Sequence, residues 1–442
     1  MNKKIIFSII FILLATIIYV GARYQATVYL MPTPALISEG ELNLFDINPG
    51  RQKSKDIQLL FATNRIPAAI GDHTAYTIFP DDKLRVGTVN IQIGEKGTSW
   101  ENILKLSTTD DTEQRFPLKL KKIQEFAQYP LINNKNAKSE MIPSQGLQAS
   151  NVQASNIQAL TEKVNEALDS SFDKDITIYI HGANTGVYRA SAQAAQYHHF
   201  TGQNSVVMVY LWPSAENFLA YGTDRQHALQ SAPAFAKLLA LLAQHTRAKN
   251  VNILAYSAGA QIISPALDII GKKTPEDKRK DYRLGEIYYA ASDIGVDTFI
   301  KHLENYYDMP RSINMAINRH DRVLALAAWR NQVSRMGRPN INDLSEEKNQ
   351  RLQVVSQQSE FTIIKVDSET VPGMQASSHN FWYSHPWVSS DILTTFLFNK
   401  RADERGLTDA VTENNVHYWK FTDRYPQCII DIISSQSRLE KN

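Results

Sequence analysis

The sequence contains almost no cysteine, since Cys428 is the single one among 442 residues. One cysteine cannot form an intramolecular disulfide or a Cys-x-x-Cys metal site. The net charge is also nearly zero, at +2. A nucleic-acid-binding protein usually carries a strongly basic face. We therefore expect no disulfide framework and no nucleic-acid partner.

Several motifs that bind cofactors or metals are absent as well. The sequence has no phosphate-binding P-loop, no GxGxxG after a predicted strand and no HExxH helix. The adjacent histidines His198 and His199 fall in a predicted helix, where we expect them to be partly exposed rather than to bind metal. The sequence thus predicts no metal and no organic cofactor.

Charge is absent from residues 5–22, IIFSIIFILLATIIYVGA, which follow Lys3 and Lys4. A run of this length lies between a signal-peptide core and a membrane span of about 20 residues. The small residues at 20–22 suit signal cleavage, and we slightly favour retention as a transmembrane anchor over cleavage. Either way, the lysines stay in the cytoplasm. We expect the rest of the chain to be exported, either free in the periplasm or anchored in the inner membrane and facing the periplasm.

Runs of β-branched and aromatic residues predict the strands. DIQLLFATNR (56–65) and RVGTVNIQI (85–93) each predict a strand, with a loop of about twenty residues between them. Helical patterns separate the later runs, which are DITIYI (175–180), SVVMVYLW (205–212), NVNILAY (250–256), RLGEIYYAASD (283–293), SINMAINRHD (312–321) and EFTIIKVDS (360–368). Alternating strands and helices predict an α/β fold with a doubly wound, mostly parallel sheet. The carboxyl ends of its strands then share one edge, where ligands bind.

One serine lies where such a strand turns into a helix. The segment LAYSAG (254–259) places Ser257 between Ala255 and Gly259. This is close to the G-x-S-x-G nucleophile elbow, in which a cramped turn requires small residues on both sides of the serine. A serine that caps the following helix is the alternative. We favour the nucleophile, because a cap would not require small neighbours.

A serine nucleophile needs a histidine base and an acid, which follow it in that fold in the order Ser, acid, His. His379 lies in the loop after the last predicted strand and is the favoured base, with His385 as the alternative. Asp321 ends the strand nearest to that loop and is the favoured acid, with Asp293 as the alternative.

A site of this kind also needs N–H donors for an oxyanion. The N–H of Ala258 follows the nucleophile directly, and the segment IHGANTG (180–186) offers the N–H of Ala183. Further residues are expected to line the site, namely His181, Gly182, Asn184, Tyr256 and Trp212.

Taken together, the motifs resemble the α/β-hydrolase fold and, more narrowly, a bacterial family of α/β-hydrolases filed as domain of unknown function 900. The resemblance covers roughly residues 56–395. It rests on FATNR (61–65), LRVGTVNIQI (84–93), IHGANTG (180–186), LWPSAENFLAYGTDR (211–225), LAYSAG (254–259), ASDIGVDTF (291–299), NRHDRVLAL (318–326) and SSHNFWYS (377–384).

The resemblance implies a Ser-Asp-His site on Ser257, Asp321 and His379. Trp212, Tyr221 and Asp224 match family positions as structural or pocket-lining residues. The chain departs from the family at three places. Tyr256 and Ala258 stand where the family often has His and Met, and Ala183 stands where it often has Phe. These changes leave the catalytic groups in place and are expected to reshape the acyl pocket.

The expected organisation has four parts. They are a signal peptide or anchor (1–22), a connector (23–55), an α/β-hydrolase domain with a polar insertion around 130–160 (56–400), and a C-terminal tail (401–442). Within the insertion, LQASNVQASNIQAL (147–160) nearly repeats a five-residue unit. We interpret it as a loop that leads into the next helix.

The sequence thus predicts a serine hydrolase, of the carboxylesterase or lipase type, that cleaves small-molecule or lipid-like esters through an acyl-enzyme. Two alternatives stay open. One is a non-catalytic scaffold that keeps the hydrolase frame, and the other is an acyltransferase that uses the same residues.

Overall fold

The computed structural model describes residues 27–40, 42–48, 53–70, 73–109, 115–131, 143–340 and 345–431. The signal or anchor segment expected at 1–22 lies outside these ranges. Among the helices within them, none is both long and apolar enough to cross a membrane.

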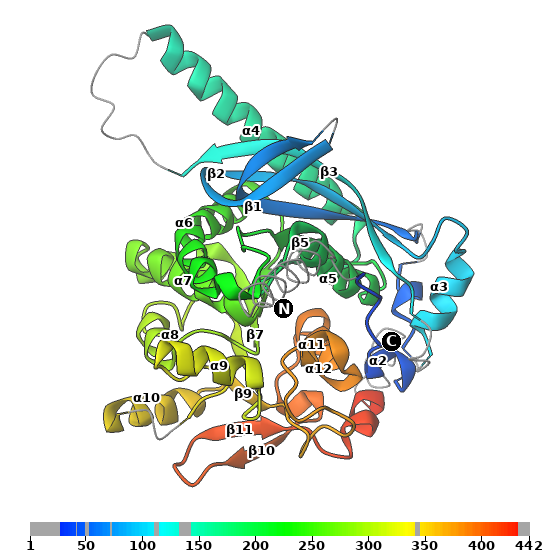
Figure 1. Ribbon diagram of the computed structural model, residues 1–442, viewed down its shortest axis with the longest axis vertical. Helices are drawn as coiled ribbons and strands as arrows, with labels where there is room; N and C mark the ends of the chain where they lie inside the picture. Colours follow the sequence, from blue (N-terminus) through cyan, green and yellow to red (C-terminus); the bar gives the residue numbers. More distant parts are fainter. Residues whose placement is uncertain are drawn as a thin grey trace, which may run out of the picture.

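One twisted sheet organises the described part of the chain (Figure 1). Its spatial order is β10-β11-β9-β8-β7-β6-β4-β5-β1-β2-β3. The strands are β1 (Asp56–Ile70), β2 (His73–Ile93), β3 (Leu118–Pro130), β4 (Ile176–Ile180), β5 (Val206–Tyr210), β6 (Val251–Tyr256), β7 (Leu284–Ala290), β8 (Ser312–Ile317), β9 (Phe361–Lys365), β10 (Thr408–Val411) and β11 (His417–Lys420). In this spatial order, every pair of neighbours from β11 through β9, β8, β7, β6, β4 and β5 to β1 is parallel. The pairs β1·β2, β2·β3 and β10·β11, at the two ends of the sheet, are antiparallel. The prediction of a mostly parallel α/β sheet is confirmed.

Helices cover both faces of this sheet, on the left and on the right of Figure 1. The side chains of β6 alternate between the faces: Ile253 and Ala255 join one apolar core, whereas Leu254 and Tyr256 join the other. The first core packs under α4 (Pro143–Ser170), α6 (Tyr221–His245), α7 (Ala260–Lys273), α8 (Val296–Leu303) and α10 (Glu346–Ser356). The second packs under α2 (Ala35–Ser38), α3 (Trp100–Ser107), α5 (Val187–Phe200), α11 (Phe381–Ser384) and α12 (Pro386–Phe398), with a contribution from α9 (Arg322–Asn331).

The prediction of a loop between residues 65 and 85 is wrong. Strands β1 and β2 form a long antiparallel hairpin there, in which Ile70 pairs with His73. The register shifts around Arg65 and Pro67. Bulges and prolines obscure the alternating strand pattern in this region, since proline cannot donate to the sheet ladder.

The repeat at 147–160 is also helical rather than a loop, since it lies within α4. Leu160, Val164 and Leu168 are buried in the first core, and residues 151–155 are exposed. A helix that is anchored at one end can extend into solvent when its residues are good helix formers such as Gln and Ala. The polar composition therefore reflected an exposed helix.

The two ends of the described chain contribute to the fold as well. Within the expected connector, the backbone N–H of Leu36 donates to Ser390 Oγ on α12 at 2.9 Å. Within the expected C-terminal tail, β10 and β11 extend the sheet, and Arg405 forms a fully buried ion pair with Asp391 of α12. Neither segment is merely a tether.

Candidate active site

Ser257 occupies the turn between β6 and α7, at the carboxyl edge of the sheet. It is 6% exposed and has a φ of +53°, which is a strained conformation for a residue other than glycine. The chain then passes so close to β4 that a Cβ on Gly259 would lie 2.7 Å from the carbonyl oxygen of Ile180. The small residues around Ser257 thus follow from a close approach between two strands.

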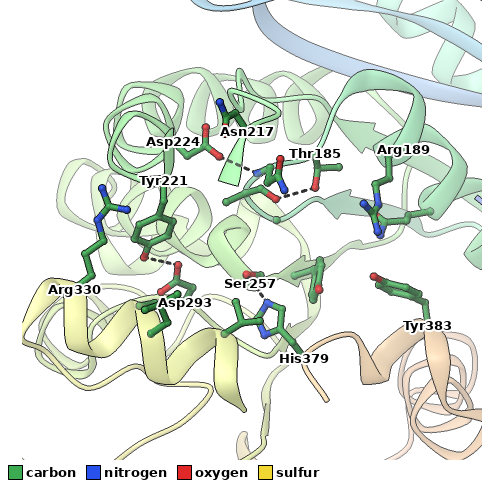
Figure 2. A pocket seen from close by; sticks show the side chains of 18 of the residues that line it. Thr185, Arg189, Asn217, Tyr221, Asp224, Ser257, Asp293, Arg330, His379 and Tyr383 are labelled. Atoms are coloured by element: carbon green, nitrogen blue, oxygen red, sulfur yellow. Dashed lines mark hydrogen bonds between the residues drawn. The ribbon is translucent and has the colours of Figure 1, made fainter. Parts of the chain in front are cut away.

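A histidine and a carboxylate complete a hydrogen-bonded chain with this serine (Figure 2). His379, from the loop between β9 and α11, lies 2.9 Å from Ser257 Oγ through Nε2 and 2.6 Å from Asp321 Oδ2 through Nδ1. A carboxylate can only accept, so we assign the proton to Nδ1, which leaves Nε2 to accept from the serine hydroxyl. The structure therefore brings together residues that are 58 and 122 positions apart.

Further hydrogen bonds hold Asp321 and the loop that carries His379. Asp321 is fully buried and caps α9, since its Oδ1 accepts from the N–H of Leu324 at 2.9 Å. Asn318, at the end of β8, donates from Nδ2 to the carbonyl oxygens of Ala376 and Ser378, at 3.0 and 2.8 Å. These contacts fix the histidine loop beside the carboxylate. Our sequence reasoning did not single out Asn318, although it lies in the NRHDR segment.

The two alternative residues have other partners. Asp293 forms a buried ion pair with Arg335 at 2.8 Å and accepts from the Tyr221 hydroxyl at 2.7 Å. Burial raises the pKa of the Asp293 carboxyl, and Arg335 opposes that rise. His385 contacts the carbonyl oxygen of Pro372 through Nε2 at 2.9 Å and caps α12. Neither side chain hydrogen-bonds to the side chain of Ser257 or His379 within the described chain, although the backbone N–H of Asp293 donates to the carbonyl oxygen of Ser257 at 3.0 Å.

The loop that follows β4 runs directly beside the serine. A Cβ on Gly182 would lie 3.0 Å from the Cβ of Ser257. Within the described residues, the N–H groups of Ala258 and Ala183 have no hydrogen-bond acceptor. Ala183 lines the same pocket as Ser257, and Ala258 directly follows the serine in the chain.

A buried carboxylate holds this loop in place. Asp224 Oδ2 accepts from the N–H of Asn184, which has a φ of +53°, and from Ser214 Oγ, both at 2.9 Å. Ser214 Oγ in turn accepts from the N–H of Thr185 at 3.1 Å. Asp224, which the family resemblance marked only as structural or pocket-lining, therefore orients two consecutive residues of the loop, Asn184 directly and Thr185 through Ser214.

Arg65, from the FATNR segment, supports the same loop from below. Its guanidinium is fully buried and donates to the carbonyl oxygens of Trp212 and Thr185, at 2.9 and 3.3 Å. Burial lowers the pKa of Arg65 to about 10, so it stays charged at neutral pH. Glu216 pairs with it at 3.5 Å. This segment of β1 thus contributes to the site although it lies far from the serine in the sequence.

His181 and Trp212 form the floor beneath the loop rather than the lining of the pocket. Their rings stack with centroids 5.1 Å apart, and Trp212 Nε1 donates to the carbonyl oxygen of His181 at 2.8 Å. Burial lowers the pKa of His181 to about 3, so its ring is neutral. His181 therefore supports the backbone and is not placed as a base.

The adjacent pair His198 and His199 is buried, contrary to the partial exposure that we expected. His199 Nε2 lies 2.7 Å from Ser107 Oγ, among the rings of Phe45 and Trp100. The physical reason is that α3 and the segment around Phe45 cover His199 on this face of α5. Across the described ranges, no group of three or more His, Cys, Asp or Glu side chains is arranged to hold a metal ion.

A pocket of about 500 Å³ opens above Ser257. Figure 2 shows Arg189 and Tyr383 on one side of the serine, and Tyr221 and Arg330 on the other. Gly182, Asn184 and Tyr256 line this pocket, as the sequence predicted. Helix α9 supplies an apolar wall made of Val323, Leu326, Ala327 and Trp329.

Comparisons with known proteins agree with this architecture at the level of the family. The family described as "Alpha/beta hydrolase of unknown function (DUF900)" matches residues 156–394. No curated protein matches the chain.

Among solved structures, the chain is similar to esterase B from Lactobacillus rhamnosis, solved in an inhibited form. The sequence identity is 12%, the coverage is 62% of this chain and 82% of the esterase, and the TM-score is 0.29. The assignment does not depend on this weak likeness, because the family match spans more than half of the chain. The chain belongs to the DUF900 family of α/β-hydrolases.

Proposed function

We propose that this protein is a serine hydrolase that cleaves carboxylic esters through an acyl-enzyme on Ser257. The observation that carries the proposal is the chain of hydrogen bonds from Ser257 through His379 to Asp321, at 2.9 and 2.6 Å. A serine with a base in contact and a buried carboxylate behind that base is the arrangement that makes a hydroxyl nucleophilic.

In the proposed reaction, Ser257 Oγ attacks the ester carbonyl while His379 Nε2 takes the hydroxyl proton. Asp321 keeps the imidazole in the required tautomer and stabilises its charged form. The N–H groups of Ala258 and Ala183 bind the oxyanion. His379 then gives the proton to the leaving alcohol, and water releases the acid from Ser257 by the same steps.

The first prediction concerns the three side chains. We expect Ser257→Ala to abolish both ester hydrolysis and covalent labelling by a fluorophosphonate probe. Asp321→Asn should lower kcat by about 10⁴-fold, because the histidine tautomer is no longer fixed. Asp293→Asn should lower kcat far less, since Asp293 contacts Arg335 and Tyr221 instead.

Steady-state kinetics and gel-based labelling measure these effects, and thermal unfolding of each variant controls for folding. Labelling that persists in folded Ser257→Ala would contradict the proposal. So would a fall in kcat that is larger for Asp293→Asn than for Asp321→Asn.

The second prediction concerns the loop that carries Ala183. Asp224→Asn replaces one acceptor oxygen with an amide NH2 group, which donates and does not accept. The remaining oxygen cannot accept from Asn184, Ser214 and Ala215 together. We expect kcat to fall roughly 10- to 100-fold with little change in KM, because a loosened donor weakens binding of the oxyanion more than of the ground state.

Kinetics on a neutral ester measure this split between kcat and KM. Asp297→Asn is the matched control, because this exposed aspartate of α8 pairs with Lys348 away from the pocket. Equal effects of the two substitutions would show that Asp224 does not position the loop for catalysis.

The wall formed by α9 supports an apolar acyl group in the substrate. Val323, Leu326 and Trp329 follow one another at three-residue intervals, so they share a helix face. Their exposed fractions are 44%, 44% and 71%, although all three line the pocket. An acyl chain lying on these side chains would remove apolar surface from water, at about 25 cal/mol per Å².

The third prediction tests this wall. Val323→Gln should lower kcat/KM for octanoate esters by roughly 5-fold, consistent with partial loss of one buried apolar contact. It should change acetate hydrolysis little, because a two-carbon acyl group does not reach along α9. Val354→Gln is the matched control, since Val354 is 60% exposed on α10 and does not line the pocket. A Val323→Gln enzyme with an unchanged chain-length profile would contradict the acyl wall.

We include export in the proposal, on the strength of residues 1–22 alone. In bacterial cells the protein should occur in the periplasm with a new N-terminus near Arg23, or in the inner-membrane fraction with residues 1–22 retained. Cell fractionation followed by N-terminal sequencing distinguishes these forms. An intact chain in the soluble cytoplasmic fraction would contradict export.

A further inference from the structure

The pocket wall opposite α9 carries an arginine that no acidic side chain of the described residues neutralises. Arg189 lies in the first turn of α5, lines the pocket and is exposed. With the residues that the structure describes, its side chain forms no ion pair and no hydrogen bond. Figure 2 shows it beside Tyr383, across the serine from Tyr221 and Arg330.

The acidic side chains that line the pocket are already committed to other partners. Asp293 is paired with Arg335 at 2.8 Å. Asp224 accepts from the N–H groups of the neighbouring loop. Neither carboxylate is left to compensate Arg189. Arg330 also lines the pocket but lies over the Tyr221 ring, whereas Arg189 places a positive charge without such a contact on the wall opposite α9.

The position of Arg189 on α5 does not help the helix. The N-terminal turn of a helix carries partial positive charge, so an acidic residue stabilises it and a basic residue does not. Arg189 stands in that turn, and no acidic residue accompanies it there. Gln193, one turn further along, lines the pocket as well, so this face of α5 is directed at the site. A ligand, rather than the fold, gives a reason for a cation at this place.

We propose that Arg189 binds an anionic group on the alcohol part of the substrate, so that the preferred substrates are anionic esters. A carboxylate or a phosphate fits equally, because a guanidinium can donate two parallel hydrogen bonds to either. The acyl chain lies on α9, and the charged leaving group lies on the opposite wall. This inference rests on the proposed ester hydrolysis and names its substrate class.

Two substrate pairs test the inference, and each pair differs only in the anionic group. The carboxylate pair is the octanoate ester of 3-hydroxy-4-nitrobenzoic acid and 2-nitrophenyl octanoate. The phosphate pair is 1-octanoylglycerol 3-phosphate and 1-octanoylglycerol. We expect kcat/KM to be about 10-fold higher for the anionic member of at least one pair, mainly through a lower KM, as one charge-assisted contact provides. The pair that shows the preference identifies the anion.

Arg189→Gln should remove this preference and leave hydrolysis of the neutral esters in place. Arg189→Lys should retain part of it, because the charge remains while the paired hydrogen bonds are lost. Arg247→Gln is the matched control. It removes the same charge from an exposed arginine that pairs with Asp169, and it should leave the preference unchanged.

The outcomes separate this inference from the proposed function. Hydrolysis of both members of each pair at equal kcat/KM overturns the anionic assignment while the hydrolase stands. A preference that survives in Arg189→Gln, or disappears in Arg247→Gln, also overturns it. If wild-type protein hydrolyses none of the esters, the proposed function and this inference fail together.

Discussion

Everything at the site depends on how closely the end of β6 approaches β4. Gly259 leaves no room for a Cβ against the carbonyl oxygen of Ile180, and a Cβ on Gly182 would lie 3.0 Å from the Cβ of Ser257, closer than ordinary van der Waals contact. At this approach Ser257 has a positive φ and lines the pocket. It also brings the loop that carries Gly182 and Ala183 next to Ser257. A larger residue at either glycine would push the Ser257 turn away from β4 and the loop that follows it.

Around this turn, buried hydrogen bonds hold two loops that have no regular secondary structure to keep them rigid. Asp224 and Arg65 hold the loop after β4, and Asn318 holds the histidine loop. Each uses a polar side chain that would be costly to bury without partners. The cost is met by backbone groups of the loops, which need partners themselves. The same hydrogen bonds therefore position the site and satisfy the buried polar groups. The geometry on which the catalytic proposal rests depends on these bonds.

Charge is distributed unevenly around the pocket. Asp293 and Asp224, the acids that line it apart from the serine–histidine chain, are held by Arg335 and by N–H donors, whereas Arg189 faces the cavity. The apolar face of α9 stands on the other side, and Arg330, near the end of that helix, lies over the Tyr221 ring at 5.7 Å from its centroid. A pocket with one apolar wall and one cationic wall suits an amphiphilic substrate, because each part of such a molecule then meets a matching surface.

The sequence alone determined the sheet, the strand-to-helix turn at Ser257 and the short set of acids and histidines able to serve it, because periodicity and small residues are local signals. It misjudged the β1–β2 hairpin and α4, where bulges, prolines and solvent exposure hide the local pattern. Only the tertiary structure decided that His379 and Asp321, rather than His385 and Asp293, form a chain with the serine. It also decided that Arg65, Asp224 and Asn318 support the loops and that Arg189 has no acidic partner among the residues that the structure describes. Contacts between residues so far apart in the chain are fixed by how the strands are ordered across the sheet, and that order has no local signature.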